Sequence, residues 1–489
     1  LVASTDLTGT GQANNLFKSG ERTSHYMVGR FGKEFNEGNQ KVNVMQTAVL
    51  RQGRRDDYGD YNSREAYTSG LDFELLFRDR TWAASGSVVG SLVDPEALAS
   101  DPTVVSKKKY GTGGTLNLSK RGGRFRGSLY GRWETGDLDL NDIGYLSSPD
   151  ELSSGLWLQY AYTPDGESRI FNRGNLNYNL NTSWLYEPRT GYDLHSGEPV
   201  WSYDRGHRAF TSTNVNGWVQ FRNHMDMWFG YNINLEGSQR WHTRDDVHLD
   251  NGETAAIPGG GPLIDEPWTW GGWWGVSTDA RKRFVASLEM SHYDDDAGNR
   301  SYRLGPSCRW NQSSAVHHRV SLSFHDRIDD TQHLINHENE GGGIGGVSYI
   351  FGDLHQRIFN LTLRTSVLFS RDQSLEVYAQ PYVTVGDYRR ARELARPDSY
   401  DLTPYEEEGF DIDDHDFSYA SINFNAVYRW EYRPGSTLYL VWTHARSTYD
   451  ERGNHADPGR FEDDLTPDAL FQNEPENRVL VKLSYWMPI

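Results

Sequence analysis

Apolar and polar residues alternate one for one along many segments of this chain. In 71–77, leucine and phenylalanine at the odd positions are separated by Asp72 and Glu74. Successive side chains of a strand point to opposite faces, so this pattern predicts a strand with one apolar and one polar face. The same alternation recurs in 125–134, 175–184, 284–291, 359–369 and 422–430. No long segment repeats with the helical period, so we predict an all-β fold.

The alternating segments are long. They run for roughly 10–16 residues, whereas the strands of globular proteins usually have about 5–6. A tilted strand that crosses a lipid bilayer needs about 9–11 residues. The length of the segments therefore favours strands that cross a membrane.

The connections between the strands differ in length in a regular way. Short turns are predicted near 36–39, 79–80, 121–123, 164–166, 223–224, 279–281, 311–314, 371–373 and 433–435. Long polar stretches lie between them, near 53–66, 94–108, 137–152, 188–208, 241–267, 327–356, 387–414 and 450–477. This alternation is typical of an up-and-down transmembrane barrel, with short periplasmic turns and long extracellular loops. We predict such an antiparallel barrel, of roughly 20 strands.

The first residues of the chain do not complete a strand. Counting from Ser24 gives roughly 19 strands, and a stub at 1–5 makes about 20, the even number expected of bacterial barrels. We therefore predict that 1–23 is a strand stub and loop that continue from an absent upstream region. Residues 1–489 are predicted to form a single barrel domain in the bacterial outer membrane.

Composition narrows the alternatives. Only 36% of the residues are hydrophobic, and no apolar run reaches the roughly 18 residues of a transmembrane helix. Aromatic residues make up 13%, which suits the girdles of a barrel at the two membrane interfaces. The net charge of -19 excludes nucleic acid as an expected partner, because phosphate binding needs clustered lysine and arginine. The expected partners are outer-membrane lipid and an upstream domain or separate protein subunit, and no cofactor is expected.

Three segments of the sequence carry a family resemblance. Residues 26–39 resemble a recurring Y-x-V-G-R-x-x-x-x-F-x-x-G-N stretch, 136–146 look like a G-D-F-E-x-N-D-L-G-F-L signature, and the ending 482–486 is also similar. The family is a poorly characterised group of bacterial outer-membrane barrels. Its members often carry an N-terminal domain that resembles a family-nine carbohydrate-binding module, and that domain is absent from this sequence. The resemblance implies a fold and a location, with no established activity.

Polar residues on the inward faces of the predicted strands are the first candidate site. Arg124, Arg126, Arg132 and Glu134 alternate with apolar residues in one segment, and Arg364 does so in another. An asparagine series extends the pattern at Asn175, Asn177, Asn179 and Asn181. These side chains line a hydrated channel in one interpretation, and a lumen packed with paired charges and amides in the other.

Two further clusters are candidates for binding. Four tryptophans fit an interfacial aromatic belt or a platform that stacks on sugar rings, namely Trp268, Trp270, Trp273 and Trp274. The carboxylates of Asp294, Asp295 and Asp296 have the hard oxygen ligands that suit Ca²⁺. That run lacks the spacing of an EF-hand loop, and solvated surface charge is the alternative, so no metal site is predicted.

A hydrolase at the barrel rim is the enzymatic alternative. His242 with Asp245 and His248, or His292 with Asp294, would be the catalytic neighbours. The sequence contains neither a G-x-S-x-G elbow nor an H-E-x-x-H motif. With 16 histidines and 68 acidic residues, such neighbours arise often by chance. No catalytic residue is therefore predicted.

The leading hypothesis for function is a channel or transport component for small polar solutes or saccharides. It follows from the polar inward column. The alternatives are a structural anchor or subunit of a surface or secretion complex, and the rim hydrolase. Conductance, a bound partner and hydrolytic activity respectively distinguish the three.

Overall fold

A computed structural model of the chain describes residues 2–5, 24–51, 64–94, 108–146, 149–164, 166, 169–239, 243, 246–406, 410–450, 470–471 and 474–487. Strands and their turns make up nearly all of them. No helix in these ranges is long and apolar enough to cross a membrane. The chain divides into two compact units: unit 1 comprises 1–161, 177–189 and 202–213, and unit 2 comprises 162–176, 190–201 and 214–489.

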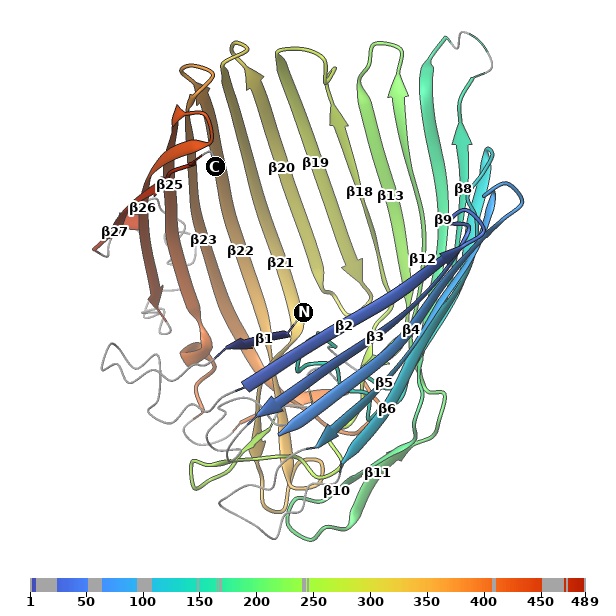
Figure 1. The fold of residues 1–489 in the computed structure, drawn as a ribbon. Helices are drawn as coiled ribbons and strands as arrows, with labels where there is room; N and C mark the ends of the chain where they lie inside the picture. The colour runs from blue at the N-terminus through green and yellow to red at the C-terminus, as the bar shows by residue number, and fades with distance from the viewer. Residues whose placement is uncertain are drawn as a thin grey trace. The chain divides into compact units, whose positions relative to one another are not determined.

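Unit 1 holds an antiparallel meander in which each strand pairs with the next along the chain (Figure 1). Its strands are β1 (Val2–Thr5), β2 (Ser24–Phe35), β3 (Gln40–Arg51), β4 (Glu65–Phe77), β5 (Trp82–Asp94), β6 (Lys109–Lys120), β7 (Phe125–Glu134) and β8 (Glu151–Tyr162). The strand stub predicted at 1–5 is the short strand β1. Two paired strands contribute residues to both units, β9 (Phe171–Leu185) and β12 (Arg208–Phe221). A hairpin of β10 (Arg189–Tyr192) and β11 (Pro199–Tyr203) connects them.

Unit 2 continues the same antiparallel pattern (Figure 1). Its long strands are β13 (Asp226–Leu235), β18 (Thr269–Ser277), β19 (Phe284–Asp295), β20 (Arg300–Asn311), β21 (Val316–Glu338), β22 (Val347–Leu368), β23 (Gln373–Leu394), β25 (Phe417–Arg433), β26 (Ser436–Asp450) and β27 (Glu476–Ser484). Short elements lie in the connections: β14 (Gly237–Gln239), β15 (Val247–His248), β16 (Thr254–Ala255), β17 (Ile264–Glu266), β24 (Leu402–Pro404) and the 3-10 helix η2 (Ile412–His415).

The predicted all-β, up-and-down antiparallel fold is confirmed. The long strands of both units, with β1, agree with the roughly 20 predicted. Short turns close one end of consecutive hairpins: β2 and β3 are joined by residues 36–39, and β25 and β26 by residues 434–435. The long connections lie at the other strand ends. One connection there is short, since only residues 296–299 join β19 to β20.

The prediction of long loops at 327–356 and 387–414 was wrong in part. β21 and β22 extend through most of the first stretch and are 23 and 22 residues long, and β23 continues to Leu394. Polar side chains there pair across the strands, as Arg327 does with Gln356, whose Oε1 accepts from the arginine Nε at 2.8 Å. Residues 347–354 are buried on both faces. The alternation that marks a strand with one apolar face is therefore missing from this part of the sequence.

The apolar faces of the strands are the exposed ones. Leu116 on β6 and Leu129 on β7 are 58% and 59% exposed. On β22, Phe359, Leu361 and Leu363 pair in register with apolar residues of β21, namely Phe324, Leu322 and Val320. In each unit the apolar face is thus exposed or half-exposed, which is the reverse of a water-soluble sheet, in which apolar residues face a core.

Candidate functional site

Three of the predicted lumen residues of unit 1 lie on one face of β7. Arg126 and Arg132 alternate with apolar residues such as Leu129. The Nε of Arg132 donates to Oε1 of Glu134 at 2.7 Å, and Glu134 is buried. Arg124 lies just before the strand, and its backbone carbonyl accepts a hydrogen bond from β8. This face, the polar face of β7, therefore carries exposed arginines, one of which pairs with a buried carboxylate.

Two asparagines of the series on β9 contact the same polar surface of unit 1. The Nε2 of Gln159 on β8 donates to Oδ1 of Asn177 at 2.9 Å. The hydroxyl of Tyr130 donates to Oδ1 of Asn181 at 3.0 Å. A Cβ at Gly155, on the strand between them, would lie 2.3 Å from the Tyr130 ring, so glycine permits this contact. The other members at odd positions of β9 are Asn175 and Asn179.

Arg364 lies on β22 in unit 2, exposed, with its guanidinium 5.1 Å from the centre of the Tyr378 ring. It pairs in register with Arg319 of β21. Like charges placed directly opposite one another destabilise a sheet. This part of unit 2 therefore places two arginines together, an arrangement that we did not predict.

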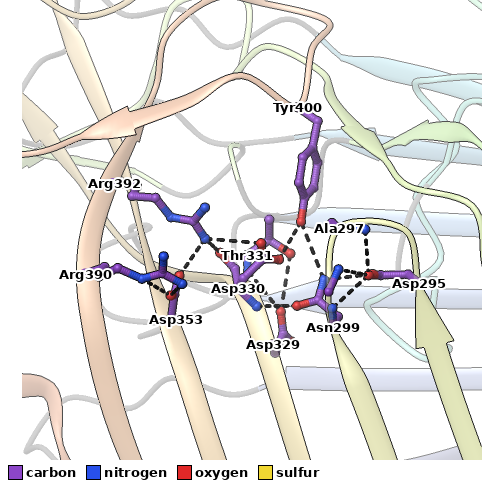
Figure 2. Close-up of polar contacts among 11 residues, drawn as sticks. Asp295, Ala297, Asn299, Asp329, Asp330, Thr331, Asp353, Arg390, Arg392 and Tyr400 are labelled. Atoms are coloured by element: carbon purple, nitrogen blue, oxygen red, sulfur yellow. Dashed lines mark hydrogen bonds and ion pairs between the residues drawn. The ribbon is translucent and has the colours of Figure 1, made fainter.

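A network of charged and hydrogen-bonded residues lies where β21–β23 meet the connections of unit 2 (Figure 2). Asp353 of β22 accepts from Nε of Arg390 at 2.6 Å and from Nη2 of Arg392 at 2.6 Å. Arg392 also contacts the backbone carbonyl of Asp330. One buried carboxylate thus holds two guanidiniums of β23, a charge-assisted arrangement that fixes both strands.

The same network fastens the connection after β23. The Tyr400 hydroxyl donates to Oδ1 of Asp330 at 2.5 Å, as Figure 2 shows. The backbone N–H of Asp330 donates to Oδ1 of Asn299 at 2.5 Å. Burial, and secondly the hydrogen bond to the Asp330 carboxylate, raises the pKa of Tyr400 far above its usual range. The hydroxyl therefore remains a donor throughout the physiological range.

The three calcium candidates do not converge. Asp294 and Asp295 are consecutive in β19, so their side chains leave opposite faces of the strand. The Asp295 carboxylate accepts the backbone N–H groups of residues 297, 298 and 299 at 3.0, 2.9 and 2.8 Å. Asp295 thus closes the tight connection to β20, and Asp296 lies within that turn. Across the described ranges, no group of three or more His, Cys, Asp and Glu is arranged to hold a metal ion.

A hydrophobic core joins the long connections of unit 2 to the extended strand ends. Val247, Ile264, Tyr349, Phe351 and Leu394 are each at most 1% exposed and belong to one cluster. The remaining members and flanking residues come from 190–201, 246–257, 344–347 and 402. We call this cluster the loop core. It explains why the ends of β22 and β23 are buried although the apolar faces below them are exposed.

The segment 135–146, which carries the family signature, packs against the strands of unit 1. Leu138 is 2% exposed and lies over Gly111 and Gly113 of β6. The backbone N–H of Asp139 donates to the hydroxyl of Ser91 on β5 at 3.0 Å. The buried Arg51 side chain, at the end of β3, forms an ion pair with Asp142 at 2.5 Å. The segment is thereby held on three strands.

We expect Gly111→Ala to displace this segment. A Cβ at Gly111 would lie 2.1 Å from Cα of Leu138, which is backbone and cannot rotate away. Amide hydrogen exchange across 135–146 should therefore accelerate in the variant. Gly90→Ala is the matched control, because the nearest heavy atom to that Cβ is 3.8 Å away. Equal protection of the segment in both variants would contradict this packing.

The four tryptophans do not form one platform. Trp270 and Trp274 lie on the exposed apolar face of β18, where Trp274 pairs with Met290. Trp273 points to the opposite face, where its ring covers Gly230. The ring of Trp268 lies 4.6 Å from that of Trp270. A pair at the strand end is compatible with either predicted role, whereas a four-ring sugar platform is not formed.

The candidate hydrolase residues are dispersed or lie outside the described ranges. His242 and Asp245 lie outside them. His248 of β15 pairs in register with Thr254 and bridges to His337. His292 lies on β19 and pairs in register with Gly272 of β18. The nearby Asp294 carboxylate accepts a hydrogen bond from the Tyr302 hydroxyl at 3.4 Å rather than from His292. No catalytic arrangement forms among these candidates in the part of the chain that the structure describes.

Comparison with protein families decides where this chain belongs. The model of the domain of unknown function DUF5916 matches residues 7–488. The chain belongs to the DUF5916 family. Membership extends over the three segments on which the resemblance rested. The N-terminal carbohydrate-binding-like domain that the resemblance implied stays a prediction.

Among solved structures, the DUF5916 chain is similar to outer-membrane proteins at low identity. The copper transporter OprC has a TM-score of 0.40 and 10% identity, covering 87% of this chain and 74% of the transporter. The outer membrane transporter YddB from Escherichia coli has a TM-score of 0.41 and 8% identity, and the match covers 87% of this chain and 63% of the transporter. The siderophore receptor PirA from Acinetobacter baumannii has a TM-score of 0.39 and 7% identity, and the match covers 87% of this chain and 74% of the receptor. TM-scores this low establish neither fold nor function. No curated protein is significantly similar to the chain.

Proposed function

We propose that this chain forms a membrane-spanning barrel of the bacterial outer membrane and acts as a conduit for small polar solutes or saccharides. The observation that carries the proposal is the orientation of the two strand faces. Apolar side chains such as Leu129 and Leu363 are exposed, while the polar residues on the other face contact one another. Contact with lipid makes an exposed apolar face of this extent favourable.

The height of the apolar surface supports this proposal. On β22 it runs from Phe359 to Val367, about 27 Å along a strand. At a barrel tilt of about 40° this spans about 21 Å, near the apolar band of roughly 25 Å in outer-membrane barrels. At its upper limit Arg357 pairs with Asp326, so charges begin where the band ends. The exposed Trp274 also belongs to this surface.

The polar faces suit a hydrated path. In unit 1 they carry amides and arginines, and in unit 2 the register places Ser321, Ser323 and Asn360 next to further polar groups. Such side chains exchange hydrogen bonds with water and with sugar hydroxyls. A purely structural barrel has no need for exposed guanidiniums on this face, so we favour the conduit over an anchor.

Conductance in a planar lipid bilayer tests the proposal. The purified full chain should produce discrete current steps, and vesicles that contain it should swell in an osmotic gradient of a small sugar. The same detergent without protein is the control. Insertion into the bilayer with neither current steps nor swelling would show a sealed barrel and contradict the conduit.

A further inference from the structure

Three arginines stand side by side across neighbouring strands of unit 2. Arg309 of β20 pairs in register with Arg319 of β21, which pairs with Arg364 of β22. The row continues to Tyr378 of β23 and Asn425 of β25. Placing like charges directly opposite one another costs stability, so the arrangement calls for a compensating anion.

The structure supplies no carboxylate to these three guanidiniums within the described residues. Arg309 donates from Nη2 to the backbone carbonyl of Ala280 at 2.8 Å, and its buried Nε has no hydrogen-bond partner. Arg364 lies over the Tyr378 ring. Arg319 is exposed on the same face. Other arginines of unit 2 do have carboxylate partners, as Arg390 and Arg392 have in Asp353.

A cavity of about 420 Å³ lies over this row. Its other lining residues include a second row of the same face, two positions nearer the short turns: Asn311, His317, Ser366, Glu376 and Val427. Glu376 is the one carboxylate among the lining residues, against three arginines. The cavity is thus locally cationic in a chain whose net charge is -19.

We propose that this cavity binds a small organic anion that carries more than one carboxylate or phosphate group. The planar guanidinium fork matches carboxylate and phosphate oxygens, and three adjacent forks favour a multivalent ligand. The volume lies in the range of small-molecule sites, about 300–1,000 Å³. Stacking on Tyr378 restrains Arg364, while Asn311 and Ser366 offer hydrogen bonds to ligand hydroxyls. The proposal rests on the proposed conduit only for access to this face.

Titration calorimetry of the full chain in detergent tests the proposal. Citrate and fructose 1,6-bisphosphate should bind saturably, whereas fructose, which lacks the charge, should not. Arg319→Gln should weaken both anions about ten- to hundredfold, as expected when a hydrogen bond to a charged group is lost. It should leave the unliganded protein equally or more stable, because it removes like-charge repulsion.

Arg303→Gln is the matched control. Arg303 also lies on β20, on the same face as Arg309, but it is outside the cavity lining and its Nε donates to the Ser323 hydroxyl at 3.1 Å. Its loss should change the affinity by less than about twofold if the site is local. No saturable anion binding, or equal weakening by both variants, would overturn the proposal. Anion binding without conductance would contradict only the proposed conduit. Conductance without anion binding would contradict only the proposed anion site.

Discussion

Arginine in place of Leu363 should destabilise the protein in a lipid bilayer by about 2–4 kcal/mol. Leu363 lies in the middle of the apolar band of β22 and pairs with Val320 and Ala379. In a barrel that spans the membrane, the introduced guanidinium would have to lie in hydrocarbon or reach for the interface. Reversible folding into lipid vesicles, followed by urea titration, measures the change in free energy of folding.

Thr362→Arg provides the control at the same depth. Thr362 is the adjacent residue, and it pairs with Ser321 on the polar face. A long cationic side chain there extends into water, so the expected cost is below about 1 kcal/mol. The account is contradicted if both variants lose the same stability, because the two faces would then meet the same surroundings.

Phe351→Ala should loosen the loop core while leaving the strands below it folded. Phe351 is fully buried, and its ring lies 5.6 Å from that of His333 in an edge-on arrangement. Truncation of a buried phenylalanine costs about 3–5 kcal/mol through lost contacts and the cavity left behind. Amide hydrogen exchange should accelerate around Val247 and Leu402, which belong to or pack against the same cluster.

Phe359→Ala distinguishes loss of the loop core from a general loss of ring packing. Phe359 lies on the same strand but within the half-exposed part of the apolar band, where it pairs with Phe324. Its truncation should leave exchange around Val247 unchanged. Faster exchange in both variants, or in neither, would mean that the loop core is not an independent packing unit.

The fold was predictable because two simple signals coincide in the sequence. Alternation with a period of two marks the strands where one face is apolar, as around Leu361. The lengths of the connections then order those strands in an up-and-down series. Both signals fail at 327–356, because His333 and Asn336 bond to each other and Phe351 is buried from both sides.

The arginine row shows why the site was not fully predictable. Arg364 was identified from its polar position, but its neighbours depend on register. The short turn at 312–315 fixes Arg309 opposite Arg319. Register shifts in β21, one on either side of His333, change the pairing with β22, so counting from the next turn would place Arg319 opposite Ser366 instead. Such bulges leave no clear mark in a single sequence.

The family signature illustrates a different limit. In the sequence, Leu138 and Asp142 lie in a stretch that reads as a polar loop. In the structure, Leu138 packs over Gly111 and Asp142 pairs with Arg51, both on strands far away in the sequence. The glycines of 341–346 have the same character. Several adopt positive φ, which allows a tight turn that brings Ile344 into the loop core. In both places glycine is needed for contacts that lie far away in the sequence.

A spin-label accessibility scan along β22 tests the central claim most directly. Single cysteines at 359–363, in a Cys308→Ser background, would carry a nitroxide in the protein reconstituted into lipid vesicles. A membrane-spanning strand predicts a period of two, with 359, 361 and 363 accessible to oxygen in lipid, and 360 and 362 accessible to a water-soluble nickel chelate. Equal access of the nickel chelate to all five positions would contradict the membrane-spanning barrel.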